Sequence, residues 1–499
     1  MRWTVTTIDR ATVLETHAAI LFFLADRAYK LKKPVNLGFL DFRSRADRER
    51  VCHREVELNR RLAPDVYLGV ADVIGPDGLP CDHLVVMRRM PAERRLSSMI
   101  RASQPVDEEL RRLARMLAAF HATARRGPEI SAEGTRDALL SRWNASFDQL
   151  RPFHGAVLDT DVATKIERLT HDFLAGREPL FDDRIATGHI VDGHADLLTD
   201  DIFCLDDGPR VLDCLEFDDR LRYIDVLDDA AFLAMDIEHL GAAASTRTFL
   251  DRYAEFSGDA APAALRHHYI AYRAFVRAKV ACLRHQQGEP SAAADVAHYA
   301  DLTLQHLSTG VVRLILVGGM PGTGKTTLAG RLADRLGAVH LSSDRIRKEL
   351  AGIDPGHSAA IDYRHGIYTA EWTDRTYREL LHRAGRLLGL GETVVLDASW
   401  SRESPRGAAH QLAAESHVPL VELRCTAAAA TVADRLRRRA AARAGASDAD
   451  GVIAAALAAD ADSWPDAHTV VTDYVPEHVV RDAMAVTARF LHPAGATVG

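Results

Sequence analysis

The sequence of 499 residues has few of the features that are typical of secreted proteins, zinc-binding domains or membrane proteins. Its six cysteines are scattered without a CxxC pair or a regular spacing, so the pattern supports neither a disulfide framework nor a zinc site. The N-terminus lacks the apolar stretch of a signal peptide, and the apolar run 18–25 is far too short to cross a bilayer. We expect reduced, mostly buried cysteines and a cytoplasmic protein with no membrane partner.

An excess of positive charge is also missing. The formal net charge is −8 and the sequence pI is about 6.3, so no general attraction draws the chain to nucleic acid or to anionic lipid. Hydrophobic residues make up 47% and charged residues 26%, the composition of an ordinary globular protein of two to four domains. These values favour small molecules as partners and give no indication of an oligomeric state.

Two kinds of pattern divide the chain. Short apolar runs separated by turns predict strands in about the first 80 residues, with a helix over about 45–62. A helical pattern follows from 107 to about 180, then a strand and loop region over 189–219, then helices to about 307. From 308 onward, strand, loop and helix alternate, which predicts a parallel sheet with crossover helices. We therefore expect two domains, 1–308 and 309–499, with a helix and a mobile loop over about 427–460.

The clearest motif directly follows the first apolar strand of the second domain and opens a helix, as GxxxxGK[ST] does in P-loop proteins. Glycines let backbone N–H groups wrap phosphates, Lys325 reaches the β and γ oxygens, and the Thr326 hydroxyl binds Mg²⁺. A chance glycine-rich turn is the alternative. The pattern predicts ATP and Mg²⁺ as ligands, held by Gly319, Met320, Pro321, Gly322, Thr323, Gly324, Lys325, Thr326 and Thr327.

The segment SSDRIR follows the second strand of this domain, at the sheet edge where ligands bind in open α/β folds. Asp344 and Arg347 lie one helical turn apart, so the carboxylate can accept the proton of an attacking hydroxyl while the guanidinium orients the acceptor. Helix capping by Ser343 or Asp344, with a solvated Arg347, is the alternative.

Two further features belong to the same chemistry. Asp397 ends the strand VVLD, where a Walker B acid holds Mg²⁺; a strand-end turn residue is the other reading. Arg435 and Arg439 share a helical face and could neutralise transition-state charge from a closing lid, although a solvated arginine-rich surface fits the pattern as well.

Residues 311–499 resemble the P-loop kinases that include polynucleotide kinase, chloramphenicol phosphotransferase and zeta toxin. The resemblance rests on the P-loop, SSDRIR, VVLDAS and the arginine-bearing segment. It implies that Asp344 is the base that activates the acceptor, that Arg347 contacts the acceptor, and that Arg435 or Arg439 is the lid arginine. It also implies a hydroxyl acceptor.

The first domain carries a second phosphotransferase pattern in HADLLTDD followed by VLD. Asp196 and Asp201 have the spacing of D-x-x-x-x-N, with Asp in place of Asn. In that chemistry Asp196 receives the proton of the acceptor hydroxyl, while Asp201 and Asp213 bind Mg²⁺.

Residues 10–300 resemble the aminoglycoside phosphotransferase-like family, in particular a branch fused to a P-loop kinase domain. The resemblance implies an α+β protein-kinase-like domain in front of an α/β P-loop NTPase domain. It implies that Lys30 contacts the ATP phosphates, with Lys32 as the rival, and that Glu55 is its ion-pair partner. His121 also matches a family position, where we expect a core histidine.

Three departures from the family pattern concern the activity of the first domain. Leu198 replaces a second histidine, Asp201 replaces Asn, and the segment 16–19 that should cover the phosphates has no glycine.

From the two domains together we expect an ATP-dependent phosphotransferase that acts on a small-molecule hydroxyl. Two alternatives stay open: activity of the P-loop domain alone, with the first domain binding substrate, and a non-catalytic regulatory module that responds to ATP.

Overall fold

The structure is a computed structural model of the chain, and it describes residues 12–15, 18–36, 41–354, 366–442 and 457–489. These residues form two compact units. Unit 1 contains the described residues up to Thr160 together with Asp183–Ala261 and Tyr269–Thr303; unit 2 contains Asp161–Asp182, Pro262–His268 and the described residues from Leu304 onward. The boundary expected between 308 and 309 falls just inside the last of these segments, and the assignment of domains stays a proposal.

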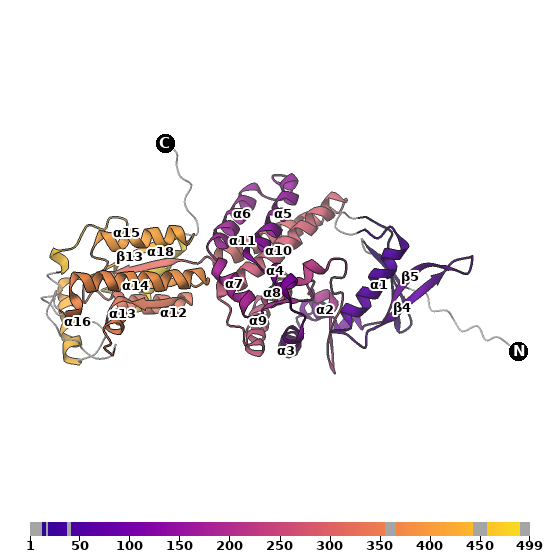
Figure 1. Cartoon of the computed structure of the whole chain (residues 1–499), viewed down its shortest axis with the longest axis horizontal. Helices are drawn as coiled ribbons and strands as arrows, with labels where there is room; N and C mark the ends of the chain where they lie inside the picture. Colours follow the sequence, from indigo (N-terminus) through magenta and orange to yellow (C-terminus); the bar gives the residue numbers. More distant parts are fainter. Residues whose placement is uncertain (1–11, 16–17, 37–40, 355–365, 443–456, 490–499) are drawn as a thin grey trace. The chain divides into compact units, whose positions relative to one another are not determined.

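Unit 1 begins with an antiparallel sheet of five strands in the order β1-β2-β3-β5-β4 (Figure 1). Helix α1 (Arg45–Asn59) starts after Ser44, whose hydroxyl accepts the Asp47 N–H at 3.1 Å. Its Cys52 and Val56 pack in one apolar cluster with side chains of the sheet. The strands are β1 (Thr12–Glu15), β2 (Ala19–Leu24), β3 (Arg27–Lys32), β4 (Tyr67–Ile74) and β5 (Pro80–Arg88).

The chain then runs mostly in helices to Thr309. Helix α8 is buried from Val226 to Ile237, as expected for a central helix that is largely apolar on every side. Two small antiparallel strand pairs, β6–β9 and β7–β8, lie in the segment that precedes α8 in the sequence. The elements are α2 (Leu96–Arg101), α3 (Asp107–Thr123), α4 (Pro128–Ala132), α5 (Arg136–Leu150), α6 (Thr160–Ala175), α7 (Glu178–Ala186), β6 (Ile190–Asp192), β7 (Ile202–Leu205), β8 (Gly208–Val211), β9 (Tyr223–Asp225), α8 (Val226–His239), α9 (Ala243–Ser257), α10 (Ala263–Gln286) and α11 (Ala292–Thr309). A sheet with one helix followed by a helical part confirms the predicted protein-kinase-like fold.

Unit 2 contains a parallel five-stranded sheet in the order β11-β12-β10-β13-β14. All five strands match predicted apolar runs. Helices α12 and α18 cover one face, where Leu328, Leu332 and Val480 pack against the central strands, while α14 contacts β11 and β12. The elements are β10 (Leu314–Gly318), α12 (Lys325–Leu336), β11 (Val339–Ser342), α13 (Ser343–Leu350), α14 (Ala370–Gly389), β12 (Val394–Asp397), α15 (Glu403–Glu415), β13 (Leu420–Thr426), α16 (Ala429–Ala442), β14 (His468–Val471) and α18 (Pro476–Arg489). This is the predicted α/β P-loop fold.

Candidate functional site

The loop between β10 and α12 requires glycine at three positions. Gly319, Gly322 and Gly324 have φ angles of 143°, 83° and 86°, which side chains rarely allow. A Cβ atom on Gly319 would lie 2.7 Å from the Cys425 carbonyl oxygen, and one on Gly322 would lie 2.9 Å from Val432 Cγ1. The motif therefore has the strand–loop–helix geometry of a P-loop, with the positive end of α12 at its close.

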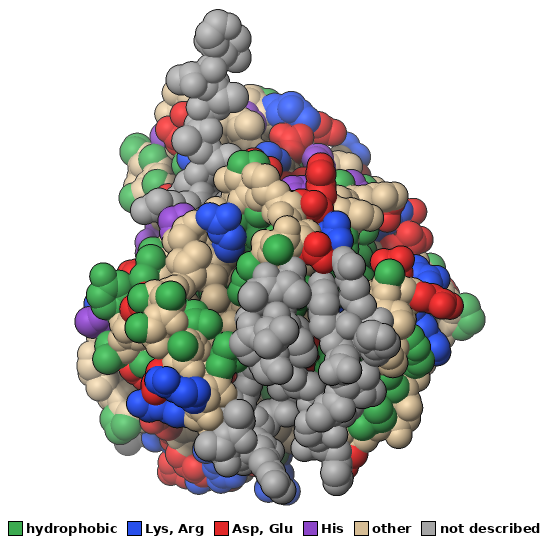
Figure 2. Space-filling view, turned by 90° about the vertical axis from the view of Figure 1, so that its left-hand side faces the viewer, with side chains coloured by type: hydrophobic (Ala, Val, Ile, Leu, Met, Phe, Trp, Pro, Cys, Tyr) green, Lys and Arg blue, Asp and Glu red, His purple; other side chains and the backbone are tan. Residues whose placement is uncertain are grey.

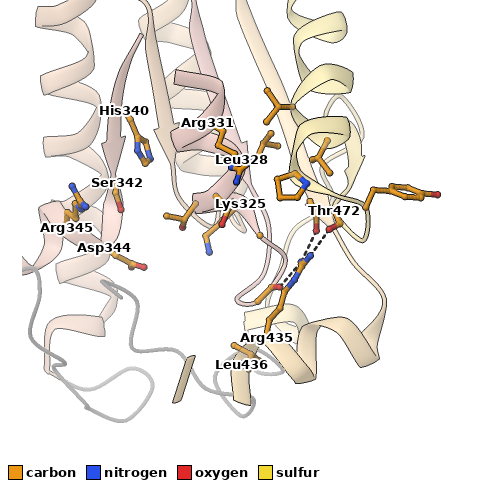
Figure 3. A pocket seen from close by; sticks show the side chains of 18 residues that line it. Lys325, Leu328, Arg331, His340, Ser342, Asp344, Arg345, Arg435, Leu436 and Thr472 are labelled. Atoms are coloured by element: carbon orange, nitrogen blue, oxygen red, sulfur yellow. Dashed lines mark hydrogen bonds between the residues drawn. The ribbon is translucent and has the colours of Figure 1, made fainter. Parts of the chain in front are cut away.

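A cavity of about 610 Å³ opens at this loop (Figure 3). In the view of Figure 3, Lys325 lies between Asp344 from α13 and Arg435 from α16. The cavity thus collects predicted residues from three elements that are far apart in the sequence. The predicted residues that line it are Gly322, Gly324, Lys325, Thr326, Thr327, Asp344 and Arg435, and sequence reasoning missed Leu328, Arg331, His340, Ser342, Arg345, Leu436, Thr472, Tyr474, Pro476, Val479 and Val480.

Asp344 stands in the first turn of α13. The N-cap residue of α13 is Ser342, and its side chain makes no capping bond. The cap position therefore lies one residue before Ser343 and two before Asp344, the two residues that the sequence offered as caps. The carboxylate is half-buried and faces the cavity. A negative charge at a helix N-terminus is favourable, so this position suits a carboxylate.

Arg347 does not line this cavity. Its side chain is buried, and Nη1 donates to the Ile367 carbonyl oxygen at 2.8 Å and to Thr373 Oγ1 at 3.3 Å. The guanidinium carbon also lies 5.1 Å from the centre of the Tyr368 ring. Arg347 thereby ties α13 to the segment that leads into α14, and Arg345 of the same helix lines the cavity instead. Acceptor contact by Arg347 remains a prediction.

Asp397 ends β12 in register with Val317 of β10 and Ser342 of β11, so it stands at the sheet edge where the P-loop begins. Its Oδ2 lies 3.7 Å from His340 Nε2, while its buried Oδ1 has no hydrogen-bond partner among the described residues. An orphaned carboxylate oxygen beside a P-loop fits the hard, oxygen-ligated Mg²⁺ ion. Thr326 and Asp397 are therefore the residues suited to hold this metal.

Arg435 is fixed against the P-loop. Its Nη1 donates to the Gly322 carbonyl oxygen at 3.4 Å and to Thr472 Oγ1 at 3.0 Å, and Nη2 donates to the Thr472 carbonyl oxygen at 2.6 Å. The Thr472 hydroxyl also lies 2.6 Å from the Thr323 carbonyl oxygen. This network joins α16, the end of β14 and the P-loop. The side chain of Arg439 lies outside the described residues, as does the segment 443–456.

Unit 1 brings together the lysine and the two acids predicted for its nucleotide site. Lys30 Nζ donates to Glu55 Oε1 at 3.0 Å and to Asp213 Oδ1 at 2.5 Å. The rival Lys32 lies on the same face of β3, 2.6 Å from Glu55 Oε2, and its other partner is Glu216. Only Lys30 of the two forms an ion pair with the predicted metal ligand Asp213, so the geometry favours Lys30 as the phosphate contact.

The loop at the start of the HADLLTDD pattern is held in place by Asp229 of α8, a residue that no spacing in the sequence indicated. Its carboxylate accepts the backbone N–H groups of His194 at 2.7 Å and Ala195 at 2.9 Å, and His121 Nε2 lies 3.1 Å away. Ala195 has a φ of 67°, a conformation that costs energy and is common at functional loops. His121 is buried, as expected of a core histidine, and supports this loop through Asp229.

The carboxyl groups of unit 1 differ in their affinity for protons. Burial raises the pKa of Asp196 to about 7, against the lowering effect of Arg277. Burial and the neighbouring Asp213 hold the pKa of Asp201 well above its ordinary value. Partial burial acts to raise the pKa of Asp213, but Lys30 outweighs it and the pKa is lowered. Asp201 therefore keeps its proton more readily than Asp213 does.

The remaining predictions have simple outcomes. Five of the cysteines are buried and Cys81 is exposed, all without disulfides. In the part of the chain that the structure describes, no helix is both long and apolar enough to cross a membrane. Residues 16 and 17 of the glycine-free segment lie outside the described residues, and Leu198 is half-buried.

Known proteins resemble the chain in one family domain, in sequence over most of its length, and among solved structures. The family described as "AAA domain" matches residues 314–460, a range that includes the P-loop. The uncharacterized protein Rv2004c of Mycobacterium tuberculosis (strain ATCC 25618 / H37Rv) is 47% identical over 462 residues, 92% of each chain. Among solved structures, a choline/ethanolamine kinase family protein from Mesorhizobium loti is 17% identical and matches 60% of this chain and 92% of its own, with a TM-score of 0.39. The GDP and kanamycin complex of APH(2")-IIia is 15% identical, matching 60% and 94%, also with a TM-score of 0.39.

Proposed function

The chain belongs to the family of Rv2004c, and we propose that it is an ATP-dependent phosphotransferase that phosphorylates a hydroxyl group of a small molecule at the P-loop cavity. One observation carries the proposal: Lys325, Thr326, Asp344 and Arg435 line a single cavity beside Asp397. A phosphate ligand, metal ligands, a base and a second cation are the parts that phosphoryl transfer needs.

The roles follow from the positions. The backbone N–H groups of the P-loop and Lys325 hold the β and γ phosphates of ATP. Thr326 and Asp397 would hold Mg²⁺, which would neutralise charge on the phosphate oxygens. Asp344 takes the proton of the acceptor hydroxyl, whose oxygen forms the new bond to the γ phosphorus while the bond to the β–γ bridging oxygen breaks and ADP leaves. Arg435 stabilises the charge on the transferred group.

The size and composition of the cavity favour a small acceptor. A volume of about 610 Å³ is in the range of small-molecule sites. Figure 2 looks onto the face that carries α16, and basic and acidic side chains are interspersed there around the grey residues. A nucleic-acid acceptor would favour a continuous basic surface, so we propose a free small molecule. The walls of the cavity carry basic side chains beside apolar ones, and Asp344 is the one acid among the described residues that line it, which suits a neutral or anionic acceptor.

We propose unit 1 as a second phosphotransfer site, since a specific arrangement supports it. Lys30, Glu55 and Asp213 are joined by ion pairs, and Asp196 stands in a loop that α8 holds in place. The residues that would hold Mg²⁺ in unit 1 are Asp201 and Asp213, and the Asp213 charge acts to raise the pKa of Asp201. Substrate binding without turnover in unit 1, and regulation by ATP, are the rival readings.

The decisive experiment is a phosphorylation screen of a metabolite library with [γ-³²P]ATP and the full chain. Transfer of label to a soluble compound, lost in Lys325→Ala and in Asp344→Asn, is the expected result. Label transfer that survives Lys325→Ala and disappears in Asp196→Ala would assign the activity to unit 1. ATP hydrolysis that only a protein partner stimulates, with no labelled product, would refute the enzyme and favour the regulatory reading.

A further inference from the structure

Unit 2 contains a second cavity, of about 420 Å³, that shares no lining residue with the P-loop cavity. Segments directly in front of β10 and β13 contribute to it, including Val312 and Pro419, and α6 and residues 264–268 form other parts. Because the strands are parallel, these residues stand at the N-terminal edge of the sheet. The P-loop follows the C-terminal edge, where open α/β folds bind their substrates. The second cavity is therefore separate from the catalytic one.

Most of the wall is apolar, but a buried cation lines it. The wall includes Leu169, Phe173, Leu307, Val311 and Val418. Arg177 is 1% exposed, and its Nη1 donates to the carbonyl oxygens of Gly176 at 2.8 Å and Ser416 at 3.0 Å. Its guanidinium carbon lies 5.7 Å from the centre of the Phe173 ring.

Arg177 has no carboxylate partner among the described residues, and its buried Nε donates to no described atom. Burial without a compensating acid lowers the pKa of Arg177 to about 10. Arg168 of the same wall pairs with Asp172 at 3.3 Å, and burial lowers the pKa of His268 to about 3, which leaves His268 neutral. A buried, unpaired guanidinium is costly to a fold unless an anion comes to it.

The unused edge of Arg177 has a definite shape. The two carbonyl oxygens take up Nη1, which leaves the parallel N–H groups of Nε and Nη2. This edge matches the two oxygens of a carboxylate. We propose that the second cavity binds a small organic carboxylate with an apolar body, with the carboxylate on the Nε–Nη2 edge of Arg177 and the apolar body against Phe173 and the aliphatic wall.

The test uses matched acid and amide pairs with the full chain in titration calorimetry: 2-naphthoate, 3-phenylpropionate and octanoate against their primary amides. At least one acid is expected to bind one to one, about 30-fold or more tighter than its amide, because the amide cannot form the buried charge pair. Arg177→Met should remove this preference. Lys325→Ala should leave it intact, which separates this cavity from the nucleotide site.

Two further variants guard against misfolding as an explanation. Ala414 lines the cavity, so Ala414→Trp should fill the cavity and abolish binding while the Arg177 charge remains. Because Ala414 is exposed, the larger side chain should leave the fold intact. Arg481 is an exposed arginine on α18, and Arg481→Met should bind the acid as the unaltered protein does. Equal affinity for acid and amide, unchanged binding in both Arg177→Met and Ala414→Trp, or no binding of any acid at about 1 mM would overturn the proposal.

Discussion

Replacement of Asp344 by Asn separates the proposed catalytic role of this residue from its structural one. The N-cap of α13 is Ser342, so Asn at 344 removes no capping bond of the N-cap side chain, and the favourable interaction of a carboxylate with the helix dipole that it loses is worth about 0.3–1 kcal/mol. ATP contacts through the P-loop are untouched. Loss of a general base should nevertheless lower phosphoryl transfer by about 10²–10⁴-fold, far more than so small a change in stability can produce.

The assay measures transfer from [γ-³²P]ATP, ATP affinity by calorimetry and thermal unfolding on the same preparation. Glu349→Gln is the matched control, because Glu349 is an exposed acid on the same helix and pairs with Arg383 at 2.7 Å, away from the cavity lining. It should lose a surface ion pair and keep its activity. If Asp344→Asn transfers phosphate at the rate of the unaltered protein, Asp344 is not the base and the assignment is wrong.

The other predictions concern both nucleotide sites. Lys325→Ala should weaken ATP binding by about tenfold or more through the loss of a charged hydrogen bond, with an unchanged circular dichroism spectrum; unaltered affinity in calorimetry would reject the P-loop assignment. In the full-length Lys325→Ala background, any unit 1 turnover should rise with pH through about 7 as Asp196 loses its proton, and a flat pH profile would exclude Asp196 as the base. Asp201→Asn should lower the Mg²⁺ concentration needed for ATP binding by unit 1 and flatten its pH dependence, because Asn has no proton to release; an unchanged metal titration would contradict this.

Unit 2 was predictable because its strands and its P-loop are determined by residues that are neighbours in the sequence. The central strands β10 and β12 are nearly continuous apolar runs, as strands covered on both faces must be, and the loop motif dictates backbone geometry through its glycines. Asp344 and Asp397 followed from one rule, that residues after parallel strands meet at one sheet edge. The same rule applied to His468–Val471 could have indicated Thr472 and Tyr474, which stand directly after that strand and line the cavity.

Side-chain direction and long-range partners could not be read in the same way. Periodicity places Arg347 one turn from Asp344, but the packing of the segment before α14 decides that its guanidinium points to Ile367. Asp229 stands in a helix where nearly every residue is buried, and only the tertiary fold brings it to the backbone N–H of Ala195, 34 residues away in sequence. Sequence spacing carries no information about such a contact.

The choice between Lys30 and Lys32 shows what the structure adds and how it bears on the activity of unit 1. Both lysines follow the same strand face, so periodicity cannot separate them. The side chain of Lys32 is 3% exposed and lies between two acids, Glu55 and Glu216, so turning toward a phosphate would break a buried pair at high cost. Lys30 shares Glu55 but reaches Asp213, whose side chain is 41% exposed, so this contact faces the open side of the site. A metal ion that binds Asp213 would compete with Lys30 for the carboxylate and release the lysine toward the phosphates. Metal binding and phosphate binding in unit 1 are therefore expected to support each other, which is why the metal titration with Asp201→Asn tests the nucleotide site as a whole.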